Sequence, residues 1–217
     1  MHIFSQESKT IVSAATIVAT FSLLSRVAGF IRDRILAGTF GAGQTLDAYY
    51  TAFLLPDFVF NLLVVGALSA SFIPLFLTYI GKHPQFDRAW KLTNSVLNIL
   101  ALVFLIISVI LFIFARPAAN LIAPGFDHKA VELTASMMRV MFLASFLLAL
   151  SIVFGSVLQA LKKFFVYSLA PILYNVGIII GALVFVPLLG AIGLAWGVVL
   201  GAILHLVTQC IAVYGTG

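Results

Sequence analysis

Apolar residues follow one another in long unbroken runs that short polar joints separate. A helix needs about 20 mostly apolar residues to cross a bilayer, and six runs meet this length. They cover roughly residues 10–36, 46–80, 90–115, 130–160, 164–187 and 190–214. Because polar and apolar positions do not alternate along them, the runs predict helices rather than the strands of a membrane barrel. The pattern predicts an all-α fold, a polytopic bundle of six transmembrane helices that forms one domain, 1–217.

Two of these runs, 46–80 and 130–160, are too long for one perpendicular crossing, so each must tilt, bend or leave the bilayer. Pro56 lies within the second run, and proline removes a backbone donor and bends a helix. Gly29 lies within the first run. We predict hinges at Gly29 and Pro56.

The composition excludes most other classes of protein. The chain is 63% hydrophobic and only 9% charged, with a mean hydropathy of +1.19, whereas a soluble domain carries about 25% charged residues. The basic residues are scattered, so nucleic acid is not an expected partner. The sequence offers no metal-ligand spacing, no nucleotide-binding motif and no nucleophile beside a base. We therefore expect a membrane protein that is not an enzyme and holds no metal or cofactor.

Lysine and arginine in the joints predict the orientation, because basic residues concentrate on the cytoplasmic side. If the six runs cross in turn, one side of the membrane has six basic residues and the other side has Arg116 and Lys129. The six are Lys9, Lys82, Arg88, Lys91, Lys162 and Lys163. This asymmetry predicts a cytoplasmic N-terminus.

Charged residues appear within the first helix, where they are costly. On a helical wheel a polar stripe falls within an arc of about 120°, with Arg34 on the opposite side. The stripe contains Ser22, Ser25, Arg26, Gly29, Arg32 and Asp33. A charge at the bilayer centre costs about 2.5–3.5 kcal/mol, so such residues normally face a bundle interior or a wet cavity. The alternative, a cluster that extends to the head groups, fits Arg34 best.

The stripe has an excess of positive charge, because Asp33 neutralises only one arginine. The planar fork of an arginine suits phosphate, so the stripe is a candidate anion site. The second helix adds Asp47, Asp57 and Asn61, and the last two lie one turn apart on one face. Asp47 has an alternative role as the N-cap after the glycine-rich turn 38–44.

Further polar residues stand alone in later apolar runs. These are Arg139, Gln159 and His205. We interpret each as a contact within the bundle rather than as a ligand.

One long segment carries a family resemblance. The stretch "LLSRVAGFIRDRILAGTFGAGQTLDAYYTAFLLPDFVFNLLVVGALSASFIPLF" resembles the start of the MurJ/MviN family of lipid II flippases, in the multidrug/oligosaccharidyl-lipid/polysaccharide exporter superfamily. The later segments "RVMFLASFLLALSIVFGSVLQALKKFFVYSLAPILYNVGIII" and "GLAWGVVLGAILHLVTQ" resemble its fourth to sixth helices. Of these segments, the first is the one whose residues are specific to this family.

The resemblance implies a function. Family members have two six-helix lobes around a cationic cavity. By alternating access they carry lipid II, an undecaprenyl-diphosphate-linked disaccharide-pentapeptide, from the inner to the outer leaflet of the bacterial cytoplasmic membrane. Arg26, Arg32 and Asp33 match the essential charged residues of the family, with Ser25 beside them. Asp47 matches the acidic residue that opens the second helix, and Asp57 stands where many members have asparagine.

The implied partners are lipid II, membrane lipids and a second lobe that these 217 residues do not contain. Two alternatives stay open. One is a flippase or exporter on the same fold for another polyprenyl-linked glycan or a drug. The other is a membrane scaffold without transport activity.

Overall fold

The computed structural model describes residues 11–65, 68–81 and 85–215, and every regular element in this part of the chain is helical. This confirms the all-α prediction. Lys9 and Lys82, which the orientation prediction uses, lie outside the described residues. The helices are α1 (Ile11–Phe40), α2 (Gln44–Phe60), η2 (Asn61–Val65), α3 (Leu68–Ile80), α4 (Phe86–Ile113), α5 (Ala115–Ile122), α6 (His128–Ala160), α7 (Phe164–Ile180), η3 (Gly181–Phe185), α8 (Val186–Leu189), η4 (Gly190–Ile192) and α9 (Gly193–Tyr214).

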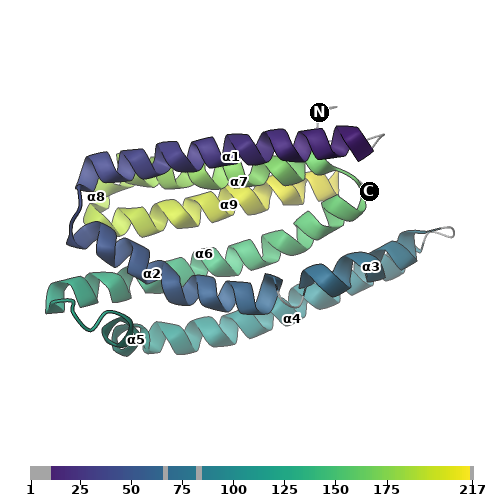
Figure 1. Ribbon diagram of the computed structural model, residues 1–217. Coiled ribbons are helices and arrows are strands. Elements are labelled where there is room, and N and C mark those ends of the chain that lie inside the picture. Colours follow the sequence, from purple (N-terminus) through teal and green to yellow (C-terminus); the bar gives the residue numbers. More distant parts are fainter. Residues whose placement is uncertain (1–10, 66–67, 82–84, 216–217) are drawn as a thin grey trace.

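The long helices lie roughly along one direction (Figure 1). Helix α6 runs through the middle and packs against α9, α2, α4 and α5, while α7 packs against α1 and α9. Eighteen residues of α6 are buried, so this helix is the centre of the bundle. The start of α1 and the end of α9 lie at the same end of the bundle (Figure 1), as an even number of crossings requires.

Four helical segments of the described residues are long and apolar enough to cross a membrane. They are Val12–Phe40, Phe86–Ile113, His128–Ala160 and Phe164–Tyr214. The last has 51 residues and contains both the fifth and the sixth predicted runs. It reverses direction around α8 and η4, where Gly190 has φ of +70°, a conformation that favours glycine. The count of six separate crossings stays a prediction.

The second predicted helix is interrupted. Helix α2 contains Pro56 and continues into a π-helical turn, Asn61–Val65, before α3 begins at Leu68. Wide π turns inside helices often occur at functional sites. Helix α1, by contrast, is continuous through Gly29. Hinge motion at Gly29 and Pro56 stays a prediction.

The long polar joint before α6 contains a helix that the pattern did not predict. Helix α5 has only eight residues, too few for a periodicity signal. Ala115 and Ala119 lie one turn apart and are fully buried, and α5 packs on α6 through this small face. An ion pair of 2.8 Å between Arg116 Nε and Glu132 Oε1 also joins the two helices.

Glycines let α7 and α9 approach closely. A Cβ atom on Gly177 would lie 2.3 Å from the Cα of Gly201, and one on Gly197 would lie 2.6 Å from the Cα of Gly181. Small residues at such contacts allow two helix backbones to pack tightly in a membrane. Steric contact therefore requires glycine at these positions.

Asp127 links the beginnings of two helices. Its carboxylate accepts the backbone N–H of Ala130 at 2.8 Å, the N-cap bond of α6, and the side-chain amide of Gln44 at 3.3 Å. These two hydrogen bonds favour the charged form and lower the pKa of Asp127 below its ordinary value. Asp127 therefore holds the start of α2 near the start of α6.

We expect this cap to make stability depend on acid pH. Because the pKa of Asp127 is lowered in the folded state, its stabilising effect is complete above the ordinary aspartate pKa of about 4 and is lost as pH falls below that value. Asp127→Asn keeps a capping oxygen, so its melting temperature should fall less on acidification than that of the parent. Asp127→Ala should melt lower already at neutral pH. Circular dichroism melts in detergent between about pH 6 and about pH 3 measure both effects. An unchanged pH dependence in Asp127→Asn would contradict the assignment.

A candidate anion site beside the charged helix

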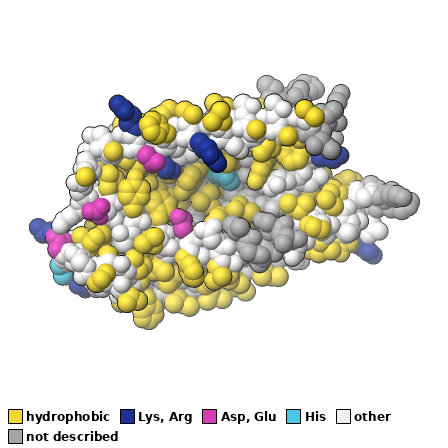
Figure 2. All heavy atoms as spheres, viewed as in Figure 1, with side chains coloured by type: hydrophobic (Ala, Val, Ile, Leu, Met, Phe, Trp, Pro, Cys, Tyr) yellow, Lys and Arg dark blue, Asp and Glu magenta, His cyan; other side chains and the backbone are white. Residues whose placement is uncertain are grey.

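A cavity of about 450 Å³ lies among α1, α2, α6 and α7, and we call it the front cavity. Figure 2 shows a hollow in this face of the bundle with a mostly hydrophobic surface and with basic and acidic side chains along it. The residues that line the front cavity are Arg32, Tyr49, Tyr50, Phe53, Asp57, Phe60, Asn61, Ser145, Leu148 and Tyr174. Three of the predicted site residues, Arg32, Asp57 and Asn61, are therefore brought together here.

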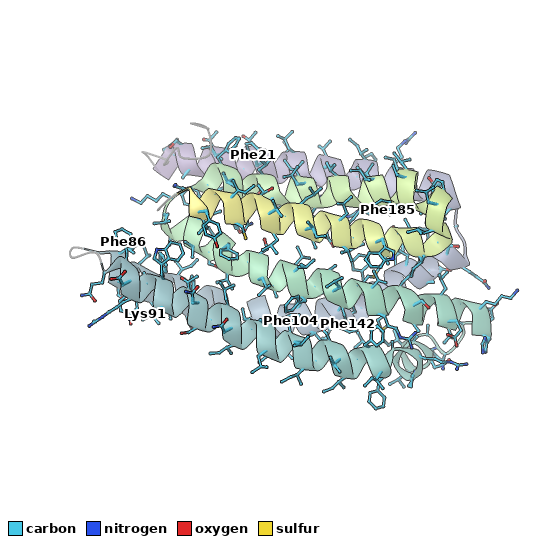
Figure 3. The ribbon with its side chains drawn as sticks, turned by 180° about the vertical axis from the view of Figure 1, so that it is seen from behind. Phe21, Phe86, Lys91, Phe104, Phe142 and Phe185 are labelled. Carbon is cyan, nitrogen blue, oxygen red and sulfur yellow. The ribbon has the colours of Figure 1, made fainter. Side chains whose placement is uncertain are left out.

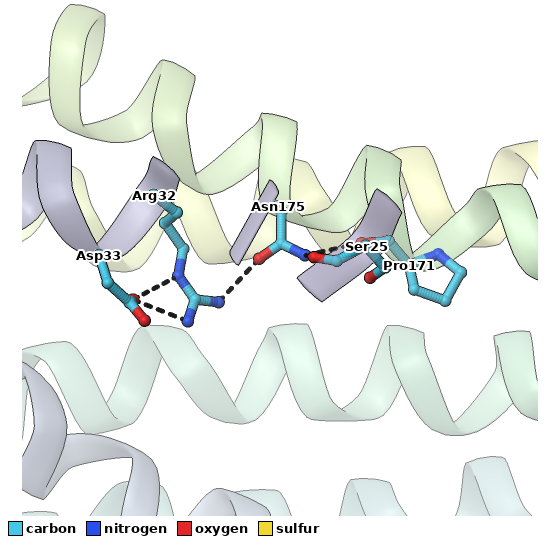
Figure 4. A network of polar contacts seen from close by, with 5 residues as sticks. All are labelled: Ser25, Arg32, Asp33, Pro171 and Asn175. Carbon is cyan, nitrogen blue, oxygen red and sulfur yellow. Dashed lines mark hydrogen bonds and ion pairs between the residues drawn. The ribbon is translucent and has the colours of Figure 1, made fainter. Parts of the chain in front are cut away.

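The guanidinium of Arg32 is held from two sides (Figure 4). Its Nε and Nη2 atoms each lie 2.9 Å from Oδ1 of Asp33. Its Nη1 atom donates to Oδ1 of Asn175 at 2.9 Å. Because a guanidinium carries five N–H donors, these three contacts leave further donors available to a ligand. The side chain is 25% exposed, which makes Arg32 an anchored cation that a ligand in the front cavity can reach.

Asn175, like the aromatic residues of the cavity wall, is a residue of the site that the sequence alone did not indicate. It lies on α7 and is only 7% exposed. Its Nδ2 atom donates to the backbone carbonyls of Pro171 at 3.0 Å and Ser25 at 3.5 Å, so the amide bridges α7 and α1 (Figure 4). The sequence does carry one sign of this residue, since Asn175 is a lone asparagine in an apolar run. Polar groups inside membrane helices are rare and tend to be functional.

The structure divides the predicted stripe into two parts. Ser25, Gly29 and Arg32 lie on the side of α1 that faces α7: the Ser25 carbonyl accepts from Asn175, and a Cβ on Gly29 would lie 3.8 Å from its Oδ1. Arg26 is exposed and lines no part of the front cavity. Among the described residues Arg26 has no ion-pair partner. The uncompensated positive charge of the stripe therefore lies on Arg26.

The acidic residues of α2 have different surroundings. Asp47 is exposed in the first turn and does not line the front cavity. Its alternative role as N-cap is wrong, because Gly43 occupies that position and the Asp47 backbone N–H donates to the Gly43 carbonyl. Asp57 does line the cavity, and Asn61 donates from its side chain to the Asp57 carbonyl at 2.8 Å. The cavity wall thus carries an acidic group as well as Arg32.

Aromatic rings form much of the remaining wall. Tyr49 makes edge-to-face contacts with Tyr50 and Phe53, with centroids 5.4 and 5.1 Å apart. Tyr174 approaches from α7. These rings present flat, largely apolar surfaces with polar hydroxyls, a combination that suits a large amphipathic ligand. In the part of the chain that the structure describes, no group of three or more histidine, cysteine or acidic side chains is placed to hold a metal ion.

Comparison with known proteins identifies the family. A family model described as "Lipid II flippase MurJ" matches residues 36–217. The chain belongs to the MurJ family of lipid II flippases. A flippase is a transporter, which agrees with the expectation that this chain is not an enzyme.

Individual MurJ proteins support this membership. The "Lipid II flippase MurJ" of Burkholderia cenocepacia is 34% identical over 197 residues, which cover 88% of this chain and 38% of that protein. The "Probable lipid II flippase MurJ" of Bdellovibrio bacteriovorus is 30% identical over 95% of this chain and 40% of that protein. The match to the Bdellovibrio protein covers 95% of this chain. The residues that it leaves out are therefore too few to contain the polar stripe of α1 and everything before it.

A solved structure described as "Lipid II flippase MurJ, inward closed conformation" aligns with a TM-score of 0.75. Its sequence is 27% identical to this chain, and the alignment covers 91% of this chain and 41% of that one. The chain thus spans about two fifths of the length of the MurJ proteins that it matches.

Proposed function

We propose that this chain is the N-terminal lobe of a transporter that moves lipid II from the inner to the outer leaflet of the bacterial cytoplasmic membrane. A second lobe would complete the central cavity, and the two lobes would alternate access to either side. The N-terminus would be cytoplasmic. The observation that carries the proposal is the guanidinium of Arg32, which Asp33 and Asn175 hold at the wall of the front cavity.

In this mechanism the diphosphate of lipid II binds to the remaining donors of Arg32. Phosphate accepts two parallel N–H bonds from a guanidinium, and the pair with Asp33 keeps the fork oriented while the cavity is empty. Arg26, exposed on the same helix, supplies the second positive charge as the substrate enters. Ser25 contributes through its backbone, because its carbonyl helps to hold Asn175. The anion therefore meets a site that is oriented before it binds.

The sugars and peptide of the head group require different contacts. Asp57 and Asn61 line the front cavity beside the π turn of η2, where they can bond to sugar hydroxyls or amides. Tyr50 and Phe60 offer ring surface to the apolar faces of the sugars. Asp47 lies outside this cavity, and we propose that it acts at the entrance after the second lobe has docked. Movement at Gly29 and Pro56 would open and close the entrance.

A rescue experiment tests the proposal. A complete transporter that contains this lobe is expressed in a bacterium depleted of its own lipid II flippase, and growth is followed. We expect growth at normal cell shape. Lysis despite normal membrane levels would reject lipid II as the substrate in that host and would favour another polyprenyl-linked glycan.

Asn175 provides a matched pair of variants. Asn175→Ala frees the guanidinium of Arg32, and we expect binding of a lipid diphosphate to weaken about tenfold, the equivalent of one lost hydrogen bond to a charged group. Asn175→Asp keeps the acceptor and the size but adds a negative charge next to the anion, so binding should weaken more. Binding of labelled lipid diphosphate in detergent measures both.

A double-mutant cycle distinguishes this positioning effect from general damage to the bundle. Asn175→Ala should add little to the loss caused by Arg32→Ala, because both changes remove the same oriented cation. Additive losses would show that Asn175 does not act through Arg32.

A further inference from the structure

A second cavity, of about 490 Å³, lies among α4, α6 and α9, and we call it the back groove. Helix α6 contributes Phe142 and Phe146 to its lining, α4 contributes Leu105 and Val109, and α9 contributes Trp196. In Figure 3 the labelled Phe142 lies between α6 and α4. The lining is almost entirely apolar, which suits hydrocarbon.

One charged residue, Arg139 of α6, also lines this groove. Its Nε atom donates to the backbone carbonyl of Phe112 at 3.1 Å, and its guanidinium carbon lies 5.4 Å from the centre of the Phe112 ring. No carboxylate of the described residues pairs with it. The carbonyl accounts for one of five donors and supplies no negative charge to balance the guanidinium. A contact within the bundle therefore explains Arg139 only in part.

Ser108 adds a second polar group that lacks a partner. Its Oγ atom is buried at the back groove and has no hydrogen-bond partner among the residues that the structure describes. Buried hydroxyls are normally satisfied. Ser108 precedes Phe112 by four residues, so it lies one turn from the carbonyl that Arg139 binds. The otherwise apolar groove thus has a cation beside Phe112 and a hydroxyl one helical turn away.

The apolar lining and the two polar groups together suit a ligand that is an amphipathic anion. Hydrocarbon fills the apolar lining, and a negatively charged group pairs with Arg139. Arg139 lies level with the end of α4 at Ile113, where the chain turns into α5, so the charge is near one end of a helix that is long enough to cross the bilayer. Trp196 at the groove suits the boundary between head groups and hydrocarbon. A soluble anion would gain nothing from the apolar lining.

We propose that the back groove is a binding site for an anionic glycerophospholipid, with its phosphate on Arg139 and one acyl chain against α4, α6 and α9. The site lies on different helix faces from the front cavity and does not depend on the transported substrate. It assigns Arg139 a ligand in addition to the bundle contact that the sequence indicated and that the bond to Phe112 confirms.

Quenching of tryptophan fluorescence tests this site directly, because the chain has only two tryptophans. In a complete transporter in which Trp90 and every tryptophan of the second lobe are replaced by phenylalanine, Trp196 reports on the back groove alone. The protein is reconstituted in nanodiscs of phosphatidylcholine with increasing fractions of acyl-brominated phosphatidylglycerol or acyl-brominated phosphatidylcholine. We expect half-maximal quenching at about fivefold lower mole fraction of the anionic lipid, the effect of one basic residue on an anionic lipid.

Charge variants assign the preference to Arg139. Arg139→Gln should remove it and Arg139→Lys should retain it, whereas Arg34→Gln, the same loss of charge on α1, should leave it unchanged. Equal quenching by the two lipids in the parent would overturn the proposal without any variant. So would a preference that survives in Arg139→Gln, or one that Arg34→Gln removes equally.

Discussion

Arg32→Ala is expected to abolish rescue of a bacterium depleted of its lipid II flippase. The change removes the fork that Asp33 and Asn175 orient in the front cavity. A hydrogen bond to a charged group contributes about 1.5–3 kcal/mol, so loss of one or two such bonds to a diphosphate weakens binding about 100-fold. Growth after depletion is measured with the variant placed in a complete transporter and with membrane levels matched to the parent.

Arg34→Ala is the matched control. It removes the same side chain two positions along α1, where Arg34 is exposed and lines no part of the front cavity, so growth should match the parent. Arg32→Lys keeps the charge but not the planar fork and should rescue only partly. Full growth with Arg32→Ala at matched levels would exclude Arg32 as the diphosphate ligand.

Gly201→Ala is expected to destabilise the bundle and to disturb the front cavity at the same time. A Cβ at this position would lie 2.4 Å from the backbone oxygen of Tyr174, so α7 and α9 must separate. Overpacking of this kind costs about 1–3 kcal/mol. Because Tyr174 lines the front cavity, lipid diphosphate binding should fall as well. Unfolding by SDS in bicelles measures the first effect.

Gly38→Ala is the control for Gly201→Ala, because it makes the same substitution where there is space for it. Gly38 also lies in a helix, α1, but a Cβ there would have no atom of the described part of the chain within 4 Å. Its free energy of unfolding should equal or slightly exceed that of the parent, because alanine favours helix more than glycine does. If Gly201→Ala and Gly38→Ala unfold alike, the close contact between α7 and α9 does not stabilise the fold.

The helical fold could be predicted because the information is local. A bilayer requires about 20 apolar residues for each crossing and satisfies backbone polar groups only within helices or closed barrels, so run length and composition suffice. The charged stripe could be predicted for a similar reason, since the cost of burying arginine marks Arg32 as a candidate site residue wherever it lies. The short helix α5 and the π turn of η2 were missed, because each has too few residues to show a period.

By itself, then, the sequence determined the type of element, the membrane setting and the helix on which the candidate site lies. Only the tertiary structure decided which side of that helix faces a neighbour. Asn175 lies 143 residues from Arg32 in the chain, and no local pattern relates them. The rotation of α1 about its axis depends on how it packs against α7, and that packing turns Arg32 toward the front cavity and leaves Arg26 exposed. A helical wheel finds a polar stripe, but only contacts between helices determine what each part of the stripe touches.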